Sequence, residues 1–229
     1  MVILAIDTST RWAGVALLAP PDRGWEIVWH SPQNHSAELA PAVQVLLERA
    51  GVTLKDLSGI VVALGPGSFS ALRVGLGFGK GLAVGLGCPI VGISTLEVEA
   101  ASVGSWGVPL CPVLDLGRGV VAWGVISPNG VSEGERVSRV EEMAEAVPVG
   151  GVVCGEGAWV YREQMRPALQ GRAVLLATPP PTRRPLALAR LGQRRLTQGA
   201  TDNLATLQPH YLRPPSIGPT RPPPSGGAP

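Results

Sequence analysis

The stretch Gly65-Pro66-Gly67-Ser68-Phe69-Ser70 stands between two apolar segments of the chain. The segment before it, 59–64, is a short run rich in Val and Ile, which predicts a buried strand. The segment after it, 71–86, predicts a helix. A strand, a tight glycine turn and a helix N-terminus together present unpaired backbone N–H groups and a positive dipole end. This arrangement therefore predicts a site for a phosphate or another anion.

The predicted helix 71–86 is unusually rich in glycine, and each glycine costs about 1 kcal/mol relative to Ala inside a helix. Gly77, Gly81 and Gly85 recur every fourth residue and form a smooth stripe, with Gly75 and Gly79 beside it. Another backbone could approach such a surface closely. We interpret the segment as a turn followed by a contact helix that serves a ligand, a partner chain or the protein's own core.

The rest of the chain predicts two α/β units. Before residue 94, apolar runs and helical periodicity give the order β-β-β-α-β-α-β, which is typical of a mixed sheet covered by helices. The segments are strands 2–6, 12–18, 25–30, 59–64 and 89–93 and helices 36–50 and 71–86. The second unit repeats this pattern with a weaker signal. Its predicted segments are strands 110–115, 120–126, 152–154 and 173–176 and a helix over 185–198.

Composition narrows the classes of protein. The chain has 229 residues, 45% of them hydrophobic, and a formal net charge of +2, so it shows no broad nucleic-acid footprint. Its three cysteines, Cys88, Cys111 and Cys154, form no C-x-x-C pair, so a reducing, cytoplasmic setting is expected. No signal peptide is recognised, and the most apolar stretch, 81–93, is too short to span a membrane.

Two predicted strands end in an aspartate followed by a polar or glycine turn, at Asp7 and at Asp115. In a two-lobed nucleotide site such carboxylates can hold a metal while the turns hold phosphates. The alternative is a turn aspartate that bonds only to local backbone. The candidate anion- or nucleotide-binding residues are Asp7, Thr8, Ser9, Gly65, Gly67, Ser68 and Asp115.

Other signatures of chemistry do not match. The glycine turn fits neither a Walker A loop nor G-x-G-x-x-G, and Ser68 lacks a G-x-S-x-G context. No two histidines stand at helical metal-ligand spacing. No metal ligand and no catalytic residue is therefore predicted.

Five segments together suggest a family. They are Ile3-Leu4-Ala5-Ile6-Asp7-Thr8-Ser9-Thr10, His35-Ser36-Ala37-Glu38-Leu39 with Pro41, Gly65-Pro66-Gly67-Ser68-Phe69-Ser70, Arg73-Val74-Gly75 and Pro209-His210-Tyr211-Leu212-Arg213. From Met1 to about Arg213 the chain resembles the bacterial TsaB family, also called YeaZ. It departs from the family pattern at Ser70-Ala71, where Thr-Gly is usual, and after Asp115, where an acid and a Tyr are missing.

The resemblance implies an α/β, actin-like (Hsp70-like) fold of two ribonuclease-H-like lobes with mixed sheets. We expect an N-terminal lobe over 1–104 and a smaller C-terminal lobe over 105–213. The last helix, about 185–198, is a candidate to pack back on the first lobe. The Pro-rich composition of 214–229 predicts a disordered tail.

The resemblance also implies a non-catalytic scaffold subunit for N6-threonylcarbamoyladenosine (t6A) formation at position 37 of tRNAs that read ANN codons. Such a subunit binds and activates the transferase TsaD as a heterodimer, is joined by the ATPase TsaE, and meets tRNA only through the complex. TsaD-type catalysts carry an H-x-x-x-H metal motif, whereas here His35 is followed four residues later by Leu39. No tightly bound cofactor is expected, and ATP or ADP between subunits stays open. The alternative function is an actin-like ATPase or kinase that uses Asp7 and Asp115.

In this family the two helices that match 36–50 and 71–86 form a bundle with the same helices of TsaD or of a second TsaB. We therefore expect partner binding, and an alternative homodimer, through these helices. The predicted contact residues are Leu39, Val43, Leu46, Leu72, Gly75, Leu76 and Gly79.

Overall fold

The computed structural model describes residues 1–212, which form two five-stranded mixed sheets. The first sheet has the order β3-β2-β1-β4-β5, in which β1 to β3 pair antiparallel and β1, β4 and β5 run parallel. Its strands are β1 (Ile3–Asp7), β2 (Trp12–Ala19), β3 (Arg23–His30), β4 (Gly59–Gly65) and β5 (Ile90–Ser94).

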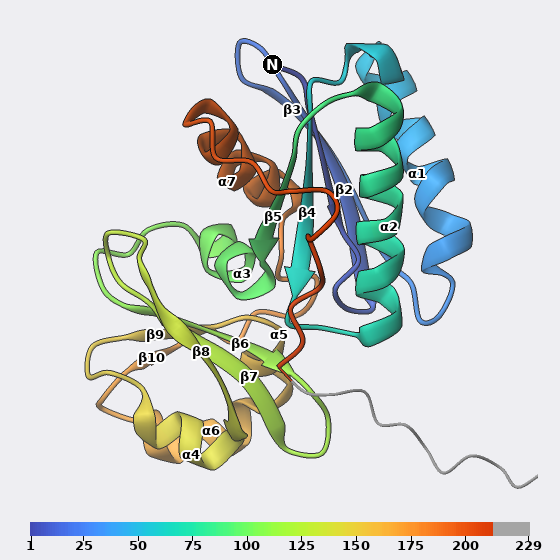
Figure 1. Cartoon of the computed structure of the whole chain (residues 1–229). Coiled ribbons are helices and arrows are strands. Elements are labelled where there is room, and N and C mark those ends of the chain that lie inside the picture. The colour runs from blue at the N-terminus through green and yellow to red at the C-terminus, as the bar shows by residue number, and fades with distance from the viewer. Residues whose placement is uncertain (213–229) are drawn as a thin grey trace, which may run out of the picture.

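Helices cover both faces of this sheet (Figure 1). α1 (His35–Ala50) and α2 (Phe69–Leu86) pack on one face, where Leu4 and Ile6 of β1 belong to their core. α7 (Pro185–Thr197) packs on the other face, against the core that contains Ile3 and Ala5. Since successive side chains of a strand point to opposite faces, a strand buried on both sides must be apolar throughout. This explains the uninterrupted apolar run at the start of the chain.

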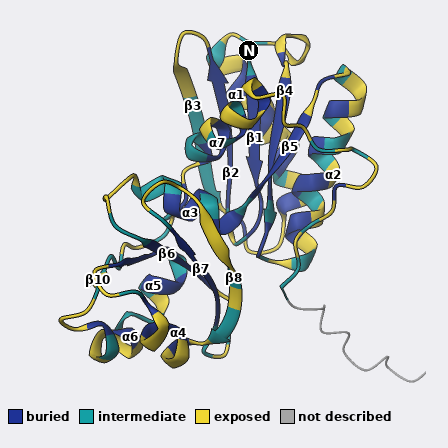
Figure 2. Ribbon diagram, turned by 60° about the vertical axis from the view of Figure 1, so that its left-hand side comes forward, coloured by how far each residue is buried: buried dark blue, intermediate teal, exposed yellow. Residues whose placement is uncertain are grey.

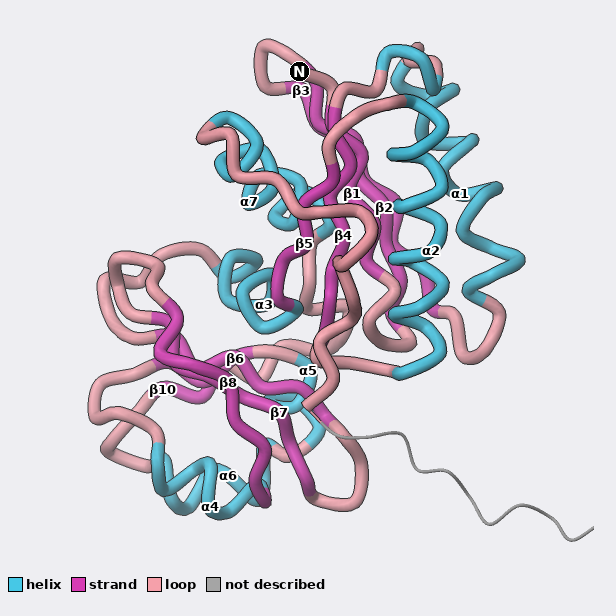
Figure 3. The backbone as a smooth tube through the Cα atoms, viewed as in Figure 1, coloured by secondary structure: helices cyan, strands magenta, loops and turns pink. Residues whose placement is uncertain are grey.

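The second sheet repeats the pairing pattern of the first, with the order β10-β9-β6-β7-β8. Its strands are β6 (Leu110–Asp115), β7 (Val120–Ile126), β8 (Ser132–Arg139), β9 (Val152–Cys154) and β10 (Val174–Leu175). α4 (Val140–Ala146) and α6 (Arg162–Leu169) pack on one of its faces around Met143 and Met165. α3 (Thr95–Val103) lies where the chain passes from the first sheet to the second, and α5 (Glu156–Val160) packs against β6 (Figure 3).

Sequence periodicity predicted all of the first sheet but missed several later elements. α3, α4, α5 and α6 are too short for their apolar spacing to stand out, and β8 is a mostly exposed edge strand with a polar sequence (Figure 2). A single 3₁₀ turn, η1 (Leu54–Asp56), precedes β4. The tail predicted over 214–229 lies outside the described residues.

α2 carries the glycine-rich segment that the sequence analysis singled out. It begins at Phe69 after Ser68, and Gly87 ends it in the left-handed conformation at φ 63°. By length and composition it is the one helix within 1–212 that could cross a membrane, yet one of its sides packs against β4.

Candidate functional site

A cavity of about 540 Å³ opens between the two sheets, and we call it the cleft. The turns after β1, β4 and β6 and the start of α5 line it. Four residues of the predicted anion site are among its lining residues, namely Ser9, Gly67, Ser68 and Asp115. The other three, Asp7, Thr8 and Gly65, are buried and do not line it.

Arg183, just before α7, is the centre of a buried charge cluster beside the cleft. Its Nε donates to Oδ2 of Asp7 at 2.9 Å, and its Nη1 donates to Oε2 of Glu99 at 3.0 Å. Its Nη2 lies 3.1 Å from Oε1 of Glu156 and donates to the Thr10 hydroxyl at 2.6 Å. The side chains of Arg183 and Asp7 are 3% exposed and that of Glu99 is 0% exposed, so these charges meet with almost no water between them.

The protonation of this cluster follows from its burial. Burial raises the pKa of Glu99 to about 7, although the neighbouring Arg183 acts in the opposite direction. Burial alone would lower the pKa of Arg183, but Asp7, Glu156 and Glu99 raise it, so the guanidinium stays charged. Near neutral pH Glu99 is therefore close to its own pKa.

The turn after β1 is closed on itself and on the Gly-Pro-Gly turn. Oδ1 of Asp7 accepts hydrogen bonds from the backbone N–H of Ser9 at 2.9 Å and from its hydroxyl at 2.5 Å. The N–H of Ser68 donates to the carbonyl oxygen of Ser9 at 2.7 Å. A Cβ on Gly67 would lie closer than 3 Å to that same oxygen. Gly67 is thus required for the close approach of the two turns. The N–H of Ser68 donates to Ser9 and is therefore not available to an anion.

Gly65 faces a different neighbour. It has φ +110°, and a Cβ there would lie 2.6 Å from the carbonyl oxygen of His210. The N–H of His210 in turn donates to the carbonyl of Leu64 at 2.7 Å. The residues of the C-terminal resemblance therefore lie against the end of β4, and Gly65 makes room for them rather than for a phosphate.

Asp115 lies on the opposite wall of the cleft and organises the turn after β6. Its Oδ1 accepts from the N–H of Gly117 at 2.7 Å and from the Tyr161 hydroxyl at 2.7 Å. Tyr161 also accepts from the N–H of Gly119 at 3.1 Å. Asp115 thus behaves as a turn aspartate that bonds to local backbone. It also accepts a hydrogen bond from Tyr161, a residue that the sequence analysis did not select.

Within residues 1–212, no three His, Cys, Asp or Glu side chains are grouped so that they could hold a metal ion. The ring of His35 is buried, and its Nε2 lies 2.9 Å from the carbonyl oxygen of Thr10. His35 therefore ties the start of α1 to the turn after β1.

The structure corrects the choice of partner-contact residues. All seven are buried inside the first unit: Leu39, Val43, Leu46, Leu72, Gly75, Leu76 and Gly79. A Cβ on Gly75 would lie closer than 3 Å to Thr8 Oγ1, and one on Gly79 would lie 2.6 Å from Val62 Cγ1. These residues seat α1 and α2 on the sheet, so a partner would touch the other side of the helices.

That other side, which we call the outward face, consists of small and apolar residues along the middle and end of α2, whereas α1 adds polar side chains such as Gln44 and Glu48. A Cβ on Gly77, Gly81 or Gly85 would meet no atom within 4 Å. Val84 of α2 and Val45 of α1 are 69% and 41% exposed. The glycine stripe predicted from the sequence is therefore open, and nothing among the described residues explains its cost in helix stability.

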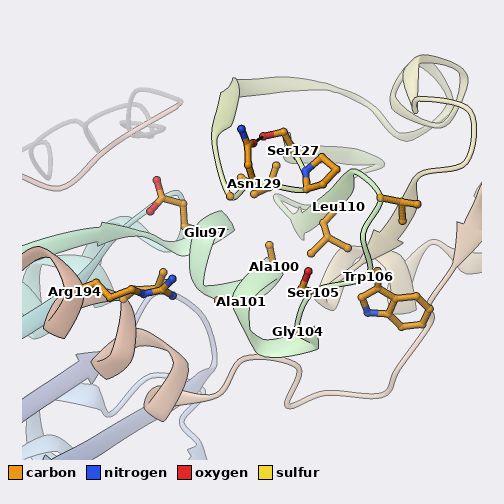
Figure 4. A pocket seen from close by; sticks show the side chains of 15 residues that line it. Glu97, Ala100, Ala101, Gly104, Ser105, Trp106, Leu110, Ser127, Asn129 and Arg194 are labelled. Atoms are coloured by element: carbon orange, nitrogen blue, oxygen red, sulfur yellow. Dashed lines mark hydrogen bonds between the residues drawn. The ribbon is translucent and has the colours of Figure 1, made fainter.

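A second concavity, of about 400 Å³, lies away from the cleft between α3, α7 and the β7–β8 turn (Figure 4). Leu110 and Ala100 form part of its apolar lining, Trp106 stands on one side, and Glu97 and Arg194 stand on the other. It contains none of the predicted site residues.

Comparisons with known proteins agree with this architecture. The sequence model of the family "TsaD: tRNA N6-adenosine threonylcarbamoyltransferase" matches residues 30–162. The tRNA threonylcarbamoyladenosine biosynthesis protein TsaB of Bacillus subtilis is 36% identical over 170 residues, which are 74% of this chain and 69% of that protein. TsaB of Escherichia coli is 34% identical over 148 residues, 61% of this chain and 62% of that protein.

Solved structures extend the likeness over nearly the whole chain. YeaZ from Pseudomonas aeruginosa is similar with a TM-score of 0.75 and 28% identity, covering 92% of this chain and 99% of that one. The activator of 2-hydroxyisocaproyl-CoA dehydratase from Clostridium difficile, solved with bound ADPNP, shares the fold at a TM-score of 0.51 and 11% identity, covering 89% of this chain and 99% of that one. The fold is thus actin-like, as the resemblance implied, and the chain belongs to the TsaB (YeaZ) family.

Proposed function

We propose that this protein is the accessory subunit that binds the transferase TsaD and supports its formation of t6A in tRNA. The observation that carries the proposal is membership of the TsaB family, whose named relatives act in tRNA threonylcarbamoyladenosine biosynthesis. The match to the TsaD sequence model adds that this chain and the transferase have a common architecture. The proposed site of modification is position 37 of tRNAs that read ANN codons. We propose that TsaE joins the pair as a third subunit.

The outward face of α1 and α2 is the surface we propose for TsaD. Its valines at 45 and 84 are exposed without an internal partner, and its open glycines let another helix approach closely. A related chain with the same two helices could pack there as a bundle. A homodimer through the same face is the competing assembly, and the two would exclude each other.

A scaffold role fits the cleft better than catalysis does. An actin-like ATPase or kinase would need Asp7 to hold a metal, yet both carboxylate oxygens of Asp7 already accept hydrogen bonds within the chain. One oxygen of Asp115, Oδ1, also accepts hydrogen bonds within the chain, from Gly117 and Tyr161. We therefore place the reaction on TsaD and not on this chain.

The test is reconstituted tRNA threonylcarbamoylation by cognate TsaD and TsaE, supplied with threonylcarbamoyl-adenylate, with and without this protein. We expect modification only when the protein is present and none from the protein alone. Unchanged modification without it would refute the scaffold role.

The surface is tested in the same assay and by direct binding to TsaD. Val84→Glu should weaken TsaD binding about tenfold or more, because it places a charge in an apolar contact. Val149→Glu is the matched control, since Val149 is 78% exposed and lies outside α1 and α2. Equal binding by the two variants would remove α2 from the interface.

A further inference from the structure

The cluster around Arg183 joins parts of the chain that belong to both sheets. Asp7 ends β1 in the first sheet, Glu99 lies in α3, and Glu156 begins α5, which packs on the second sheet. Arg183 itself lies in the segment that returns from β10 to α7. One guanidinium thus fixes three carboxyl groups from three separate elements.

The actin-like fold raises the question of whether the cleft suits a metal nucleotide. Mg²⁺ needs carboxylate oxygens that are free to face it or its water ligands. Oδ2 of Asp7 is bonded to Arg183, and Oδ1 accepts two bonds from Ser9. Oε1 of Glu156 is taken by Arg183 and by the Thr10 hydroxyl. Asp7, whose two oxygens are both occupied in this way, therefore does not fit a metal ion.

The donors that would cradle phosphates do not fit either. The N–H of Ser68 at the start of α2 donates to the Ser9 carbonyl, and the two turns are too close for a phosphate to pass between them. The charged residues that line the cleft also oppose an anion, because one guanidinium group faces two carboxyl groups there. They are Arg11 against Asp115 and Glu156.

We infer that Arg183 is a built-in counter-cation that takes the place of a metal ion at the base of the cleft and ties the two sheets together without a nucleotide. A guanidinium suits this role because its planar, always charged group donates in several directions at once. Removing it would leave buried carboxylates without a counter-charge, which is strongly destabilising. The arrangement of the two sheets would then depend on a side chain and not on a ligand.

The first experiment titrates the whole protein with Mg²⁺-ATP and with Mg²⁺-ADP by calorimetry. We expect no saturable binding up to about 1 mM, a concentration at which even a weak specific site would be detected. Saturable binding that Asp115→Ala weakens about tenfold would overturn the inference, since it would place a nucleotide in the cleft.

The second experiment compares Arg183→Ala with Arg194→Ala, a matched control on the exposed side of α7. Arg183→Ala should lower the melting temperature by roughly 10 °C, and Arg194→Ala should leave it nearly unchanged. Arg183→Ala should also gain a rise in melting temperature with millimolar Mg²⁺ or Ca²⁺ that the unaltered protein lacks. Equal melting temperatures, or an equal response of both proteins to the cations, would overturn the inference.

Should Arg183→Ala fail to fold, Arg183→Lys provides the same comparison. Lys keeps the charge but is a point donor that cannot hold three carboxyl groups at once. We expect a smaller loss of melting temperature and faster amide exchange at the start of α5 and in the turn after β1. Unchanged exchange in both segments would refute a role for Arg183 in joining the sheets.

Discussion

Nη1 of Arg183 donates a hydrogen bond to Oε2 of Glu99 at 3.0 Å, and both side chains are almost completely shielded from solvent. Burial raises the pKa of Glu99 from an ordinary 4.5 to about 7. Arg183 opposes this shift, whereas Glu156 of α5 adds to it, and the buried thiol of Cys154 on β9 also faces the group. Between pH 4.5 and pH 7 the folded protein therefore holds a proton on Glu99 that the unfolded chain has released.

The sign of the pH dependence follows from this difference. The contribution of Glu99 to stability is fully present below pH 4.5 and is lost as the pH rises through 7, a change of about 3 kcal/mol. Glu99→Gln resembles the protonated acid at every pH, so its free energy of unfolding should rise relative to the unaltered protein between pH 5 and pH 8. Urea unfolding at several pH values measures it, with Glu48→Gln on the exposed side of α1 as the control. Parallel pH curves for Glu99→Gln and the unaltered protein would contradict the assignment.

The glycines of α2 should divide into two groups by their neighbours. Gly75→Ala puts a Cβ against Thr8 Oγ1, whose hydroxyl donates to the Ala71 carbonyl at 2.6 Å. We expect a loss of about 1–3 kcal/mol in the free energy of unfolding from this overpacking. Gly77→Ala meets open space and should stabilise the helix by about 1 kcal/mol. Thermal unfolding of the pair decides the matter, and shifts of the same sign would show that α2 is seated differently.

The open glycines predict a conflict between stability and binding. Replacing Gly77, Gly81 and Gly85 together by Ala should raise the melting temperature of the isolated chain, because each change removes a helix penalty. If TsaD approaches this face closely, the same variant should bind TsaD more weakly. A variant that is both more stable and binds TsaD as well as the unaltered protein would show that the glycines do not serve this contact.

The first sheet was predictable because each of its strands is marked by a short apolar run and by the turn next to it in the sequence. Residues 3–6 of β1 are apolar on both faces, and the glycine turn and helix follow β4 directly in the chain. The choice of helix face was not predictable, since α2 carries glycines on both sides and the sequence alone does not say which side packs on the sheet. Gly75 and Gly79 fill the inner side, whereas the stripe that includes Gly77 is outside.

The charge cluster was hidden from sequence reasoning for a different reason. Arg183 lies 176 positions from Asp7 and 84 from Glu99, so no spacing rule connects them. Only the apolar neighbours of Glu99 in α3, Val98 and Ala100, hinted that this acid would be buried. Asp7 was predicted to bind an anion because it ends a strand and begins a polar turn. Its actual partner is Arg183, which is distant in the sequence.

The segment around Tyr211 is held to α2 by a cluster of two aromatic rings and an arginine. The guanidinium of Arg73 stacks 3.9 Å from the centre of the Phe69 ring, and its Nε donates to the Tyr211 hydroxyl at 3.1 Å. The Phe69 and Tyr211 rings lie 4.7 Å apart, between centroids. This cluster holds the segment around Tyr211 against α2 and the end of β4.

Tyr211→Ala should therefore release this segment without unfolding the protein. We expect faster amide exchange at His210, whose N–H donates to Leu64, and a fall of at most about 1 kcal/mol in the free energy of unfolding, because the cluster is only partly buried. Tyr211→Phe keeps the ring and loses only the bond to Arg73, so its exchange should stay near that of the unaltered protein. Hydrogen exchange read by mass spectrometry compares the two. Equal protection in Tyr211→Ala and the unaltered protein would mean that backbone bonds alone hold the segment in place.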